Sequence, residues 1–292
     1  MKGVLNQQQA DRFGGITRLY GENSVVALSQ AHIAVVGLGG VGSWAAEALV
    51  RSGVGEVTLI ELDDVCVTNT NRQLHALTSN VGKPKVQVMA ARLSDINPAL
   101  TVHAVADFLT KKNMRELIDK RLHVVIDATD SAHIKAALVA YCSAIKLRLV
   151  TVGSSGGKRN PQLVTVADLG FTESDPMLAK VRTQLYRHYR FERSGLEQKD
   201  PCQNNKVQRR KFRVDAVYST EQMVYPKPDG SVCQEKQTLA NGVKLDCAGG
   251  FGSSVMVTGT FGFAAAYKAI ERYLQMRFNQ PQDARKQAFP SS

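Results

Sequence analysis

The chain has 292 residues, 43% of them apolar and 22% charged, so it can bury a core and is unlike a disordered chain. It has a formal net charge of +11, and its five cysteines show no C-x-x-C spacing, which excludes a readable cysteine zinc site. The odd cysteine count and the lack of a signal-peptide pattern favour the reducing cytoplasm.

Short apolar runs alternate with amphipathic stretches in the first half of the chain. Strands are predicted at 32–36, 56–61, 101–105, 123–127 and 149–152. Helices are predicted at 43–52, 83–96 and 131–145, the first of them opened by a Ser43 cap. This alternation predicts an α/β fold with a doubly wound, Rossmann-like, mostly parallel sheet.

The pattern changes after residue 153. A strand is predicted at 163–167, a helix at 176–189, a polar loop at 192–212, a strand region at 214–225 and a long helix at 255–278. We therefore expect an ATP-binding adenylation core over 1–155. A C-terminal extension for substrate or tRNA binding and dimerisation would cover 156–278, and a disordered tail would cover 279–292.

One stretch of 21 residues, 247–267, carries no charge. Its length would permit a membrane span, but five glycines interrupt it. We expect a buried packing helix with a glycine-rich entry, and membrane association through this stretch is the alternative.

A glycine turn lies where the first predicted strand becomes a helix. Gly37, Gly39 and Gly42 fit the G-x-G-x-x-G spacing, Gly40 lies between them, and Glu61 ends the second strand. Glycines let a phosphate approach backbone N–H groups at a helix N-terminus, and the carboxylate can accept hydrogen bonds from ribose hydroxyls. The turn predicts a bound nucleotide, and a nicotinamide or flavin cofactor competes with ATP.

Polar residues around this turn indicate which of these nucleotides binds. Asp63, Asn69 and Arg72 follow the second strand, Lys85 lies at the start of the next helix, and Asp130 follows the fourth strand. Cationic groups bind phosphate oxygens, and a carboxylate at this edge suits a magnesium ion that bridges phosphates. Hydride transfer needs none of them, so the set favours ATP and Mg²⁺. Taken singly, Arg72 and Lys85 suit surface ion pairs, and Asp130 suits a helix N-cap.

Four motifs occur in order: GLGGVGS at 37–43, E-x-D-x-V…N-x-N-R-Q over 61–73, G-x-P-K at 82–85 and D-A-T-D at 127–130. They resemble the ubiquitin-activating-enzyme-like adenylyltransferases, which include the molybdopterin and thiamine sulfur-carrier activators. The resemblance implies that Glu61 binds ribose and that Asn69, Arg72 and Lys85 contact the triphosphate. Asp130 would bind the metal–ATP, and the catalytic residues would be Arg72, Lys85 and Asp130.

The start of the chain departs from that family. Arg12 matches the first arginine of its R-[YF]-x-R motif, but Gly15 replaces the second, which can reach across a dimer into the partner's ATP. Arg18 is the candidate substitute.

Segments over nearly the whole chain, including 12–21 and 63–73, resemble one subfamily, the tRNA threonylcarbamoyladenosine dehydratases, also described as sulfur acceptors of a cysteine desulfurase. The segments that carry the likeness include DPMLAK at 175–180, DGSVC at 229–233 and CAGGFG at 247–252. The resemblance implies a homodimer and a tRNA substrate, with a cysteine desulfurase and its sulfur-acceptor protein as further partners. A monovalent cation is a further candidate beside Mg²⁺.

By this resemblance, the free carboxylate of a threonylcarbamoyl group, on an adenosine next to the anticodon, attacks the α-phosphate of ATP. Pyrophosphate leaves, and the substrate's own ureido group closes a ring and releases AMP, so no enzyme nucleophile is required. Two alternatives stay open. One is activation of a ubiquitin-like sulfur-carrier protein with a thioester on Cys233, and the other is a sulfur-relay adaptor that accepts persulfide on Cys233.

Basic residues gather between 180 and 213. This window has eleven Lys or Arg and three acids, which supplies +8 of the net +11. An RNA substrate would explain the excess, and a solvated basic helix and loop is the alternative. The candidate tRNA-binding residues are Lys180, Arg182, Arg187, Arg209, Arg210 and Lys211.

Overall fold

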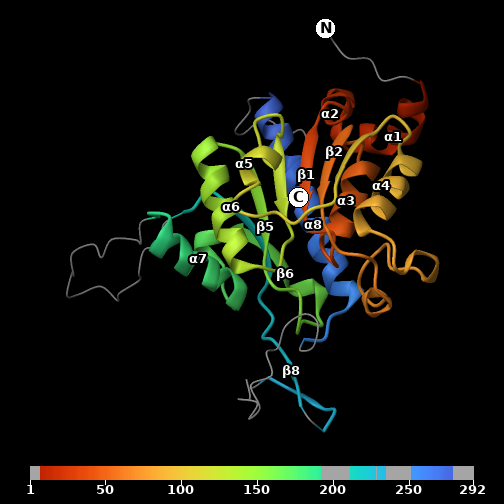
Figure 1. The fold of residues 1–292 in the computed structure, drawn as a ribbon. Coiled ribbons are helices and arrows are strands. Elements are labelled where there is room, and N and C mark those ends of the chain that lie inside the picture. Colours follow the sequence, from red (N-terminus) through yellow and green to blue (C-terminus); the bar gives the residue numbers. More distant parts are fainter. Residues whose placement is uncertain (1–6, 192–210, 228, 235–250, 279–292) are drawn as a thin grey trace.

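The computed structural model describes residues 7–191, 211–227, 229–234 and 251–278. Seven strands form one sheet in the order β3-β2-β1-β4-β5-β7-β6, and every neighbouring pair is parallel except β6 and β7 (Figure 1). The strands are β1 (His32–Val36), β2 (Glu56–Ile60), β3 (Thr101–Val105), β4 (Val124–Asp127), β5 (Arg148–Val152), β6 (Val164–Asp168) and β7 (Asp215–Ser219). The predicted doubly wound, mostly parallel α/β sheet is confirmed.

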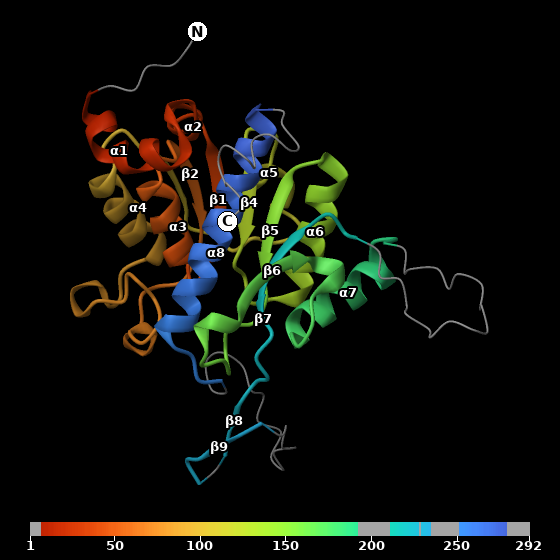
Figure 2. The ribbon, with the colours of Figure 1, turned by 180° about the vertical axis from the view of Figure 1, so that it is seen from behind.

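Helices cover both faces of the sheet, because its central strands are apolar on both sides. One face carries α1 (Gln7–Tyr20), α2 (Glu22–Leu28), α3 (Gly42–Arg51), α4 (Lys85–Ile96) and α8 (Val255–Phe278). The other carries α5 (Met114–Leu117), α6 (Ala132–Ile145) and α7 (Pro176–His188). Figure 2 shows α8 across the first face, beside α3.

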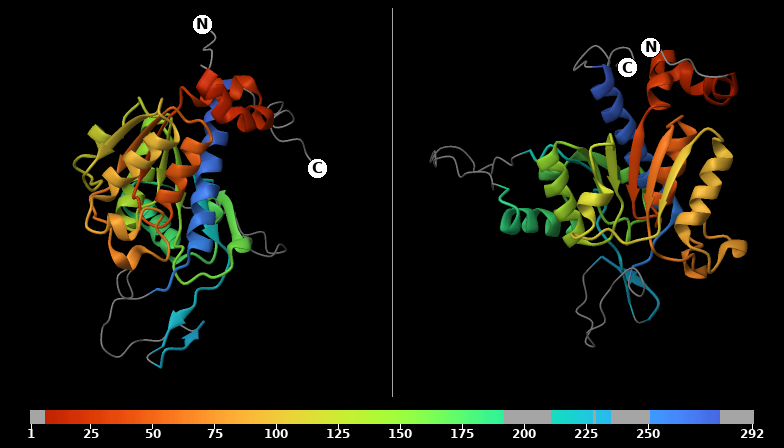
Figure 3. Two further views of the ribbon diagram at one scale, coloured as in Figure 1. Left: turned by 90° about the vertical axis from the view of Figure 1, so that its right-hand side faces the viewer. Right: turned by 45° about the horizontal axis from the view of Figure 1, so that its top comes forward.

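Short elements complete the fold. Four 3-10 turns are η1 (Val67–Asn69), η2 (Thr78–Asn80), η3 (Pro161–Leu163) and η4 (Leu169–Phe171). The strands β8 (Tyr225–Pro226) and β9 (Val232–Cys233) pair as a separate antiparallel hairpin. The hairpin projects away from the main sheet, beyond the end where the loops after β1 and β2 lie (Figures 1 and 3).

The packing interpretation of the 247–267 stretch is confirmed for its described part. A methyl group on Gly262 would lie 2.6 Å from the Val41 carbonyl oxygen and 2.8 Å from Cβ of Trp44, so this glycine lets α8 lie directly on α3. Among the helices of the described residues, none is long and apolar enough to cross a bilayer.

Several predicted bounds agree with the structure, and one cap was wrong. The bounds of β1, β3 and α8 are as predicted, whereas α1 and α2 were not foreseen. Val41 caps α3, and Ser43 lies inside the helix, where its hydroxyl donates to the Gly39 carbonyl at 2.7 Å. The tail 279–292 and most of the 192–212 loop lie outside the described residues. The domain division stays a prediction; strands from both of its parts share the main sheet.

A buried ion pair holds the end of β4 to α6. Lys135 Nζ lies 3.2 Å from Asp127 Oδ1 and also donates to the Asp127 carbonyl at 3.1 Å, and both side chains are at most 1% exposed. Hydroxyls of Thr129 and Thr151 donate to the same carboxylate, each at 2.8 Å. These bonds compensate the desolvation of the charges, which would otherwise be costly.

We therefore expect Lys135→Met to lower the free energy of unfolding by about 3–5 kcal/mol, because it leaves the Asp127 charge buried without its partner. Chemical denaturation measures this. Lys112→Met, at an exposed position, is the control and should change stability by less than about 0.5 kcal/mol. Equal stability of the two variants would contradict the role given to the pair.

Candidate active site

The candidate site lies where β1 and β4 end side by side. The chain leaves β1 toward α3 on one face and leaves β4 toward α6 on the other, so the sheet has its topological switch point between these strands. In open α/β sheets ligands bind at the carboxyl ends of strands at this point.

The glycine turn is packed too closely for side chains at two positions. Gly37 has a φ of 86°, and a methyl group there would lie 2.8 Å from the Ala128 carbonyl oxygen; one on Gly42 would lie 1.8 Å from the Gly37 carbonyl oxygen. Gly39 is different, because a methyl group there would have its nearest neighbour, Gln73 Nε2, at 4.0 Å. The fold therefore requires the first and last glycines, and the open space at Gly39 is available to a ligand.

Glu61 ties this turn to the end of β2. Its Oε2 accepts the Leu38 N–H at 2.9 Å, and its Oε1 accepts the N–H groups of Leu62 and Asp63, each at 3.0 Å. The side chain is buried, and three bonds leave lone pairs on the carboxylate unused. Glu61 thus shapes the turn and keeps acceptor capacity for a ribose hydroxyl.

Arg72 is held beside the turn by its backbone. Its carbonyl oxygen accepts from Trp44 Nε1 of α3 at 3.1 Å and from the Thr258 hydroxyl of α8 at 3.4 Å. Its side chain passes Gly40, where an added methyl group would lie 3.2 Å from Arg72 Cγ, and Nη1 donates to the Thr68 carbonyl at 2.9 Å. The guanidinium retains donors for a phosphate.

Asn69 has a local structural role. Its Oδ1 accepts the Cys66 N–H at 3.1 Å, and its own carbonyl accepts the N–H groups of Arg72 and Gln73. The side chain is buried. Asn69 therefore sets the loop conformation that presents Arg72.

Lys85 begins α4 and faces Asp63. Its ammonium is 3.0 Å from Asp63 Oδ2, and its backbone N–H donates to the Asp63 carbonyl, also at 3.0 Å. Lys85 is buried, whereas Asp63 is exposed, so the pair places a cation behind an accessible carboxylate. The ion pair holds the Lys85 ammonium at this edge of the sheet, where Asp63 neutralises its charge.

Asp130 is exposed, and among the described residues no side chain donates a hydrogen bond to it. The alternative interpretation of this residue as a helix cap is wrong, since Ser131 caps α6 by accepting the Ile134 N–H. Asp130 follows β4 by three residues, and Ala128 in between touches Gly37. An exposed carboxylate in this place could coordinate a metal ion that is bound to phosphates.

Comparison with known proteins gives the family. The ThiF family model matches residues 15–288. The chain belongs to the ThiF family. Within it, the chain is 47% identical to the tRNA threonylcarbamoyladenosine dehydratase of Escherichia coli (strain K12), over 94% of this chain and 97% of that protein. It is 44% identical to the protein of the same name from Haemophilus influenzae, over 95% and 98% of the two chains.

Solved structures agree. The E. coli enzyme TcdA in complex with ATP has a TM-score of 0.79 and 42% identity, covering 95% of this chain and 100% of that one. Its complex with AMP has a TM-score of 0.80 and 44% identity, with the same coverage of both chains. The chain is thus a ThiF-family protein of the tRNA threonylcarbamoyladenosine dehydratase group.

Arg12, which matches the family motif, and Arg18, its candidate second arginine, lie away from the other site residues. Arg12 is exposed on α1, and its Nη1 donates to the carbonyl of Ile96, the last residue of α4. Because α4 begins at the nucleotide edge with Lys85, its last residue lies at the opposite edge of the sheet. Arg18 is also exposed on α1. Neither arginine joins the glycine turn within one subunit.

The candidate tRNA-binding residues differ in exposure and in their contacts within the protein. Lys180 and Arg187 are exposed on α7 and Lys211 is exposed nearby in the chain, whereas Arg182 donates to the Leu169 carbonyl at 3.3 Å and to the Thr172 hydroxyl. Arg209 and Arg210 lie outside the described residues.

Aromatic rings in the basic window pack within the protein. Tyr186 lies 5.7 Å from Phe212 between ring centroids, and Phe191 stacks on the same ring at 5.4 Å. These contacts engage the rings of Tyr186, Phe191 and Phe212 with one another.

A second polar cluster at the carboxyl edge was missed. Asp175 caps α7 and accepts the Ser154 N–H at 2.8 Å, and burial raises its pKa. Burial also lowers the pKa of Lys158, whose ammonium donates to the carbonyls of Ser174 and Glu221. These residues come from separate loops, so no spacing in the sequence could have grouped them.

His75 was also missed. It is 1% exposed, both ring nitrogens lack a hydrogen-bond partner among the described residues, and burial lowers its pKa to about 4. It lines a cavity of about 360 Å³ between α4 and the loop before it, together with Lys83 and Arg92. The ring is neutral at physiological pH and fills space behind Lys85.

Gly39→Ala and Gly42→Ala should separate ligand binding from folding. We expect Gly39→Ala to keep the melting temperature within a few degrees but to weaken ATP binding by about tenfold or more, because the methyl group occupies the space open to a phosphate. Gly42→Ala should destabilise the fold by about 1–3 kcal/mol or more through overpacking.

Calorimetric ATP titration and thermal melting of both variants provide the check. Unchanged ATP affinity in Gly39→Ala would show that the nucleotide does not use this turn.

Proposed function

We propose that this chain catalyses the ATP-dependent dehydration of threonylcarbamoyladenosine in tRNA next to the anticodon. The 47% identity to a dehydratase of that name, over 94% of the chain, carries the proposal. The carboxyl edge of the sheet supports the proposal. The glycine turn lies there beside the hydrogen-bond acceptor Glu61, the cation Arg72 and the exposed carboxylate of Asp130. A cytoplasmic location goes with this substrate.

The residues of this edge suit adenylation of a carboxylate. Gly39 and the N-terminus of α3 would hold the phosphates of ATP, and Glu61 would accept hydrogen bonds from the ribose hydroxyls. Arg72 and Lys85 stabilise the negative charge that develops as the substrate carboxylate attacks the α-phosphate and pyrophosphate leaves. Asn69 acts through the loop that it shapes, by positioning Arg72.

Asp130 is the residue that would hold magnesium through ATP. Its carboxylate is exposed and accepts no hydrogen bond from a side chain of the described residues, so its oxygens suit coordination of Mg²⁺. Magnesium, when bound, neutralises phosphate charge as a Lewis acid. Asp63, after β2, holds the Lys85 ammonium at the same edge of the sheet.

The second step needs no nucleophile from the protein. In the acyl-adenylate, the substrate's own ureido group attacks the activated carbonyl carbon, closes a ring and expels AMP, so that the net loss is one water. An intramolecular attack of this kind has a large entropic advantage. Cys233 therefore has no required part in the dehydration.

A homodimer would account for the position of Arg12 and Arg18. Both are exposed on α1 and far along the fold from the glycine turn of their own subunit, so a contact with ATP would be made in the partner's site. Apolar side chains exposed on α8, among them Met256 and Phe263, support a face that a second copy covers.

Sulfur transfer is a separate proposal. One similar solved structure carries the name TcdA (CsdL), with a TM-score of 0.81 and 45% identity over 95% of this chain. A cysteine desulfurase and its sulfur-acceptor protein are the partners we propose, with Cys233 on the projecting β8–β9 hairpin as the acceptor.

Asp130→Asn should fold normally and lose at least about a hundredfold in turnover, because the amide cannot replace a charged metal ligand. Cys233→Ala should retain turnover. The assay uses ATP and tRNA carrying the threonylcarbamoyl group, followed by mass spectrometry of the digested nucleosides.

Full activity of Asp130→Asn would show that Asp130 does not hold the metal ion. An inactive but folded Cys233→Ala would instead favour a covalent intermediate on the thiol.

Replacing Lys180 and Arg187 together by Ala should weaken tRNA binding and reduce its salt dependence, by about 0.9 in the slope of log K against log salt per lost phosphate contact. ATP affinity should stay unchanged, since no ATP-site residue lies on α7. The matched control replaces Lys112 and Arg115, two exposed cations outside the basic window. The same loss in both double variants would show a general charge effect rather than a docking surface.

A further inference from the structure

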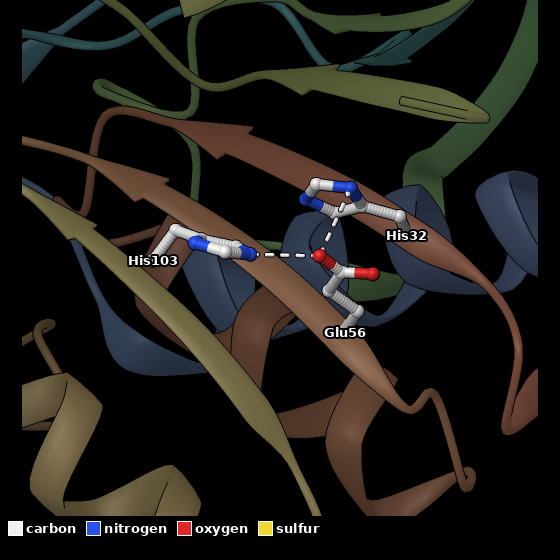
Figure 4. A group of neighbouring side chains, drawn as sticks. All are labelled: His32, Glu56 and His103. Carbon is white, nitrogen blue, oxygen red and sulfur yellow. Dashed lines mark hydrogen bonds and ion pairs between the residues drawn. The ribbon is translucent and has the colours of Figure 1, made fainter. Parts of the chain in front are cut away.

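Three side chains meet at the edge of the sheet opposite the nucleotide site. His32 and Glu56 are the first residues of β1 and β2 and are paired in register, and His103 of β3 is paired with Thr58 of β2. Since every second residue of a strand faces the same way, His32, Glu56, Thr58 and His103 share one face. Figure 4 shows both imidazoles directed at the Glu56 carboxylate.

The spacing of the donor atoms is close to that of a metal site. His103 Nε2 lies 2.7 Å and His32 Nδ1 lies 3.4 Å from Glu56 Oε1, and all three ligand atoms lie within 4.8 Å of one another. Zinc ligands at 2.0–2.1 Å in a tetrahedron are about 3.3–3.4 Å apart. The His32–Glu56 distance already matches, and the His103–Glu56 distance must lengthen by about 0.7 Å. The two imidazole nitrogens, which lie within 4.8 Å of each other, must reach the same separation.

The two partly exposed side chains can make that shift. The Glu56 side chain is 37% exposed and that of His103 is 48% exposed, whereas that of His32 is 10% exposed and held in place. Exposure on one side also provides an entry path and leaves room for water at a fourth coordination position.

A hydrogen bond with Thr58 orients the buried His32 imidazole. His32 Nε2 lies 2.8 Å from the Thr58 hydroxyl, so a proton on Nε2 can be donated there while Nδ1 presents its lone pair to Glu56. Metal-bound histidines typically make such a bond with the nitrogen that does not bind the metal.

We propose that His32, Glu56 and His103 form a binding site for a first-row divalent cation, with Zn²⁺ as the best match to two imidazoles and one carboxylate. The parallel strands place the site roughly 16 Å from the glycine turn along β1, so it takes no part in the phosphoryl chemistry. A bound ion would join the amino ends of β1, β2 and β3 and stabilise the native sheet.

Neighbouring charges limit the affinity. The cation Arg121 acts on His32 from the segment before β4, and Asp119 compensates it through an ion pair of 2.8 Å. His123 Nδ1 accepts the His32 N–H at 2.9 Å, and so that nitrogen is not available as a further ligand. We therefore expect a three-ligand site that is weaker than a four-ligand structural zinc site.

The test is titration of the full chain with Zn²⁺ alone, after chelator treatment, followed by calorimetry. His103→Ala should lose more than about tenfold in Zn²⁺ affinity for one site. Thr58→Val should lose about tenfold or more, because it removes the hydroxyl that orients His32. His133→Ala, an exposed histidine on α6, is the matched control and should bind as the parent does. Cysteine thiols also bind zinc. The proposal is therefore tested by the difference in Zn²⁺ affinity between His103→Ala and His133→Ala.

Thermal melting gives a second readout. Zn²⁺ should raise the melting temperature of the parent and of His133→Ala but not that of His103→Ala, because an ion that binds only the folded chain stabilises it. The proposal is overturned if the parent binds no Zn²⁺, or if His103→Ala binds it with the affinity and stoichiometry of the parent. In either case the three residues form only a hydrogen-bonded cluster.

Discussion

The close approach of the glycine turn to β4 is the constraint on which the nucleotide site depends. A carbonyl oxygen of Ala128 occupies the space that a side chain on Gly37 would need, and the carbonyl of Gly37 in turn excludes any side chain on Gly42. Because the turn is this tight, α3 begins beside the ends of both strands. Its first N–H groups, Glu61 and the segment that carries Asp130 then face one space.

Local patterns predicted the elements whose signals are local. The apolar run of β1, which is buried on both sides, and the long helix α8 have the predicted bounds. The helix α1 has no such signal, because Gly14 and Gly15 disfavour a helix interior by about 1 kcal/mol each. Tertiary packing compensates for them: Phe13 is buried, with its ring 3.4 Å from the position of a side chain on Gly53.

The candidate site was predictable to the extent that its residues follow consecutive strands in short motifs. Arg72, Lys85 and Asp130 could be assigned because parallel strands end at one edge. Their partners could not, since Trp44 and Thr258 hold the Arg72 carbonyl from helices far apart in the sequence. The Ser43 cap failed for a related reason, because the hydroxyl is used to close the glycine turn onto Gly39.

The two edges of the sheet carry different chemistry for a physical reason. At the carboxyl edge, the N-terminus of α3 and the Arg72 guanidinium suit phosphates. A compact cluster of two imidazoles around Glu56 lies at the amino edge. A reaction that closes a ring within its own substrate asks the protein for positioning and charge rather than for a nucleophile. That demand can be met entirely at the carboxyl edge, which leaves the amino edge free for a separate role in stabilising the sheet.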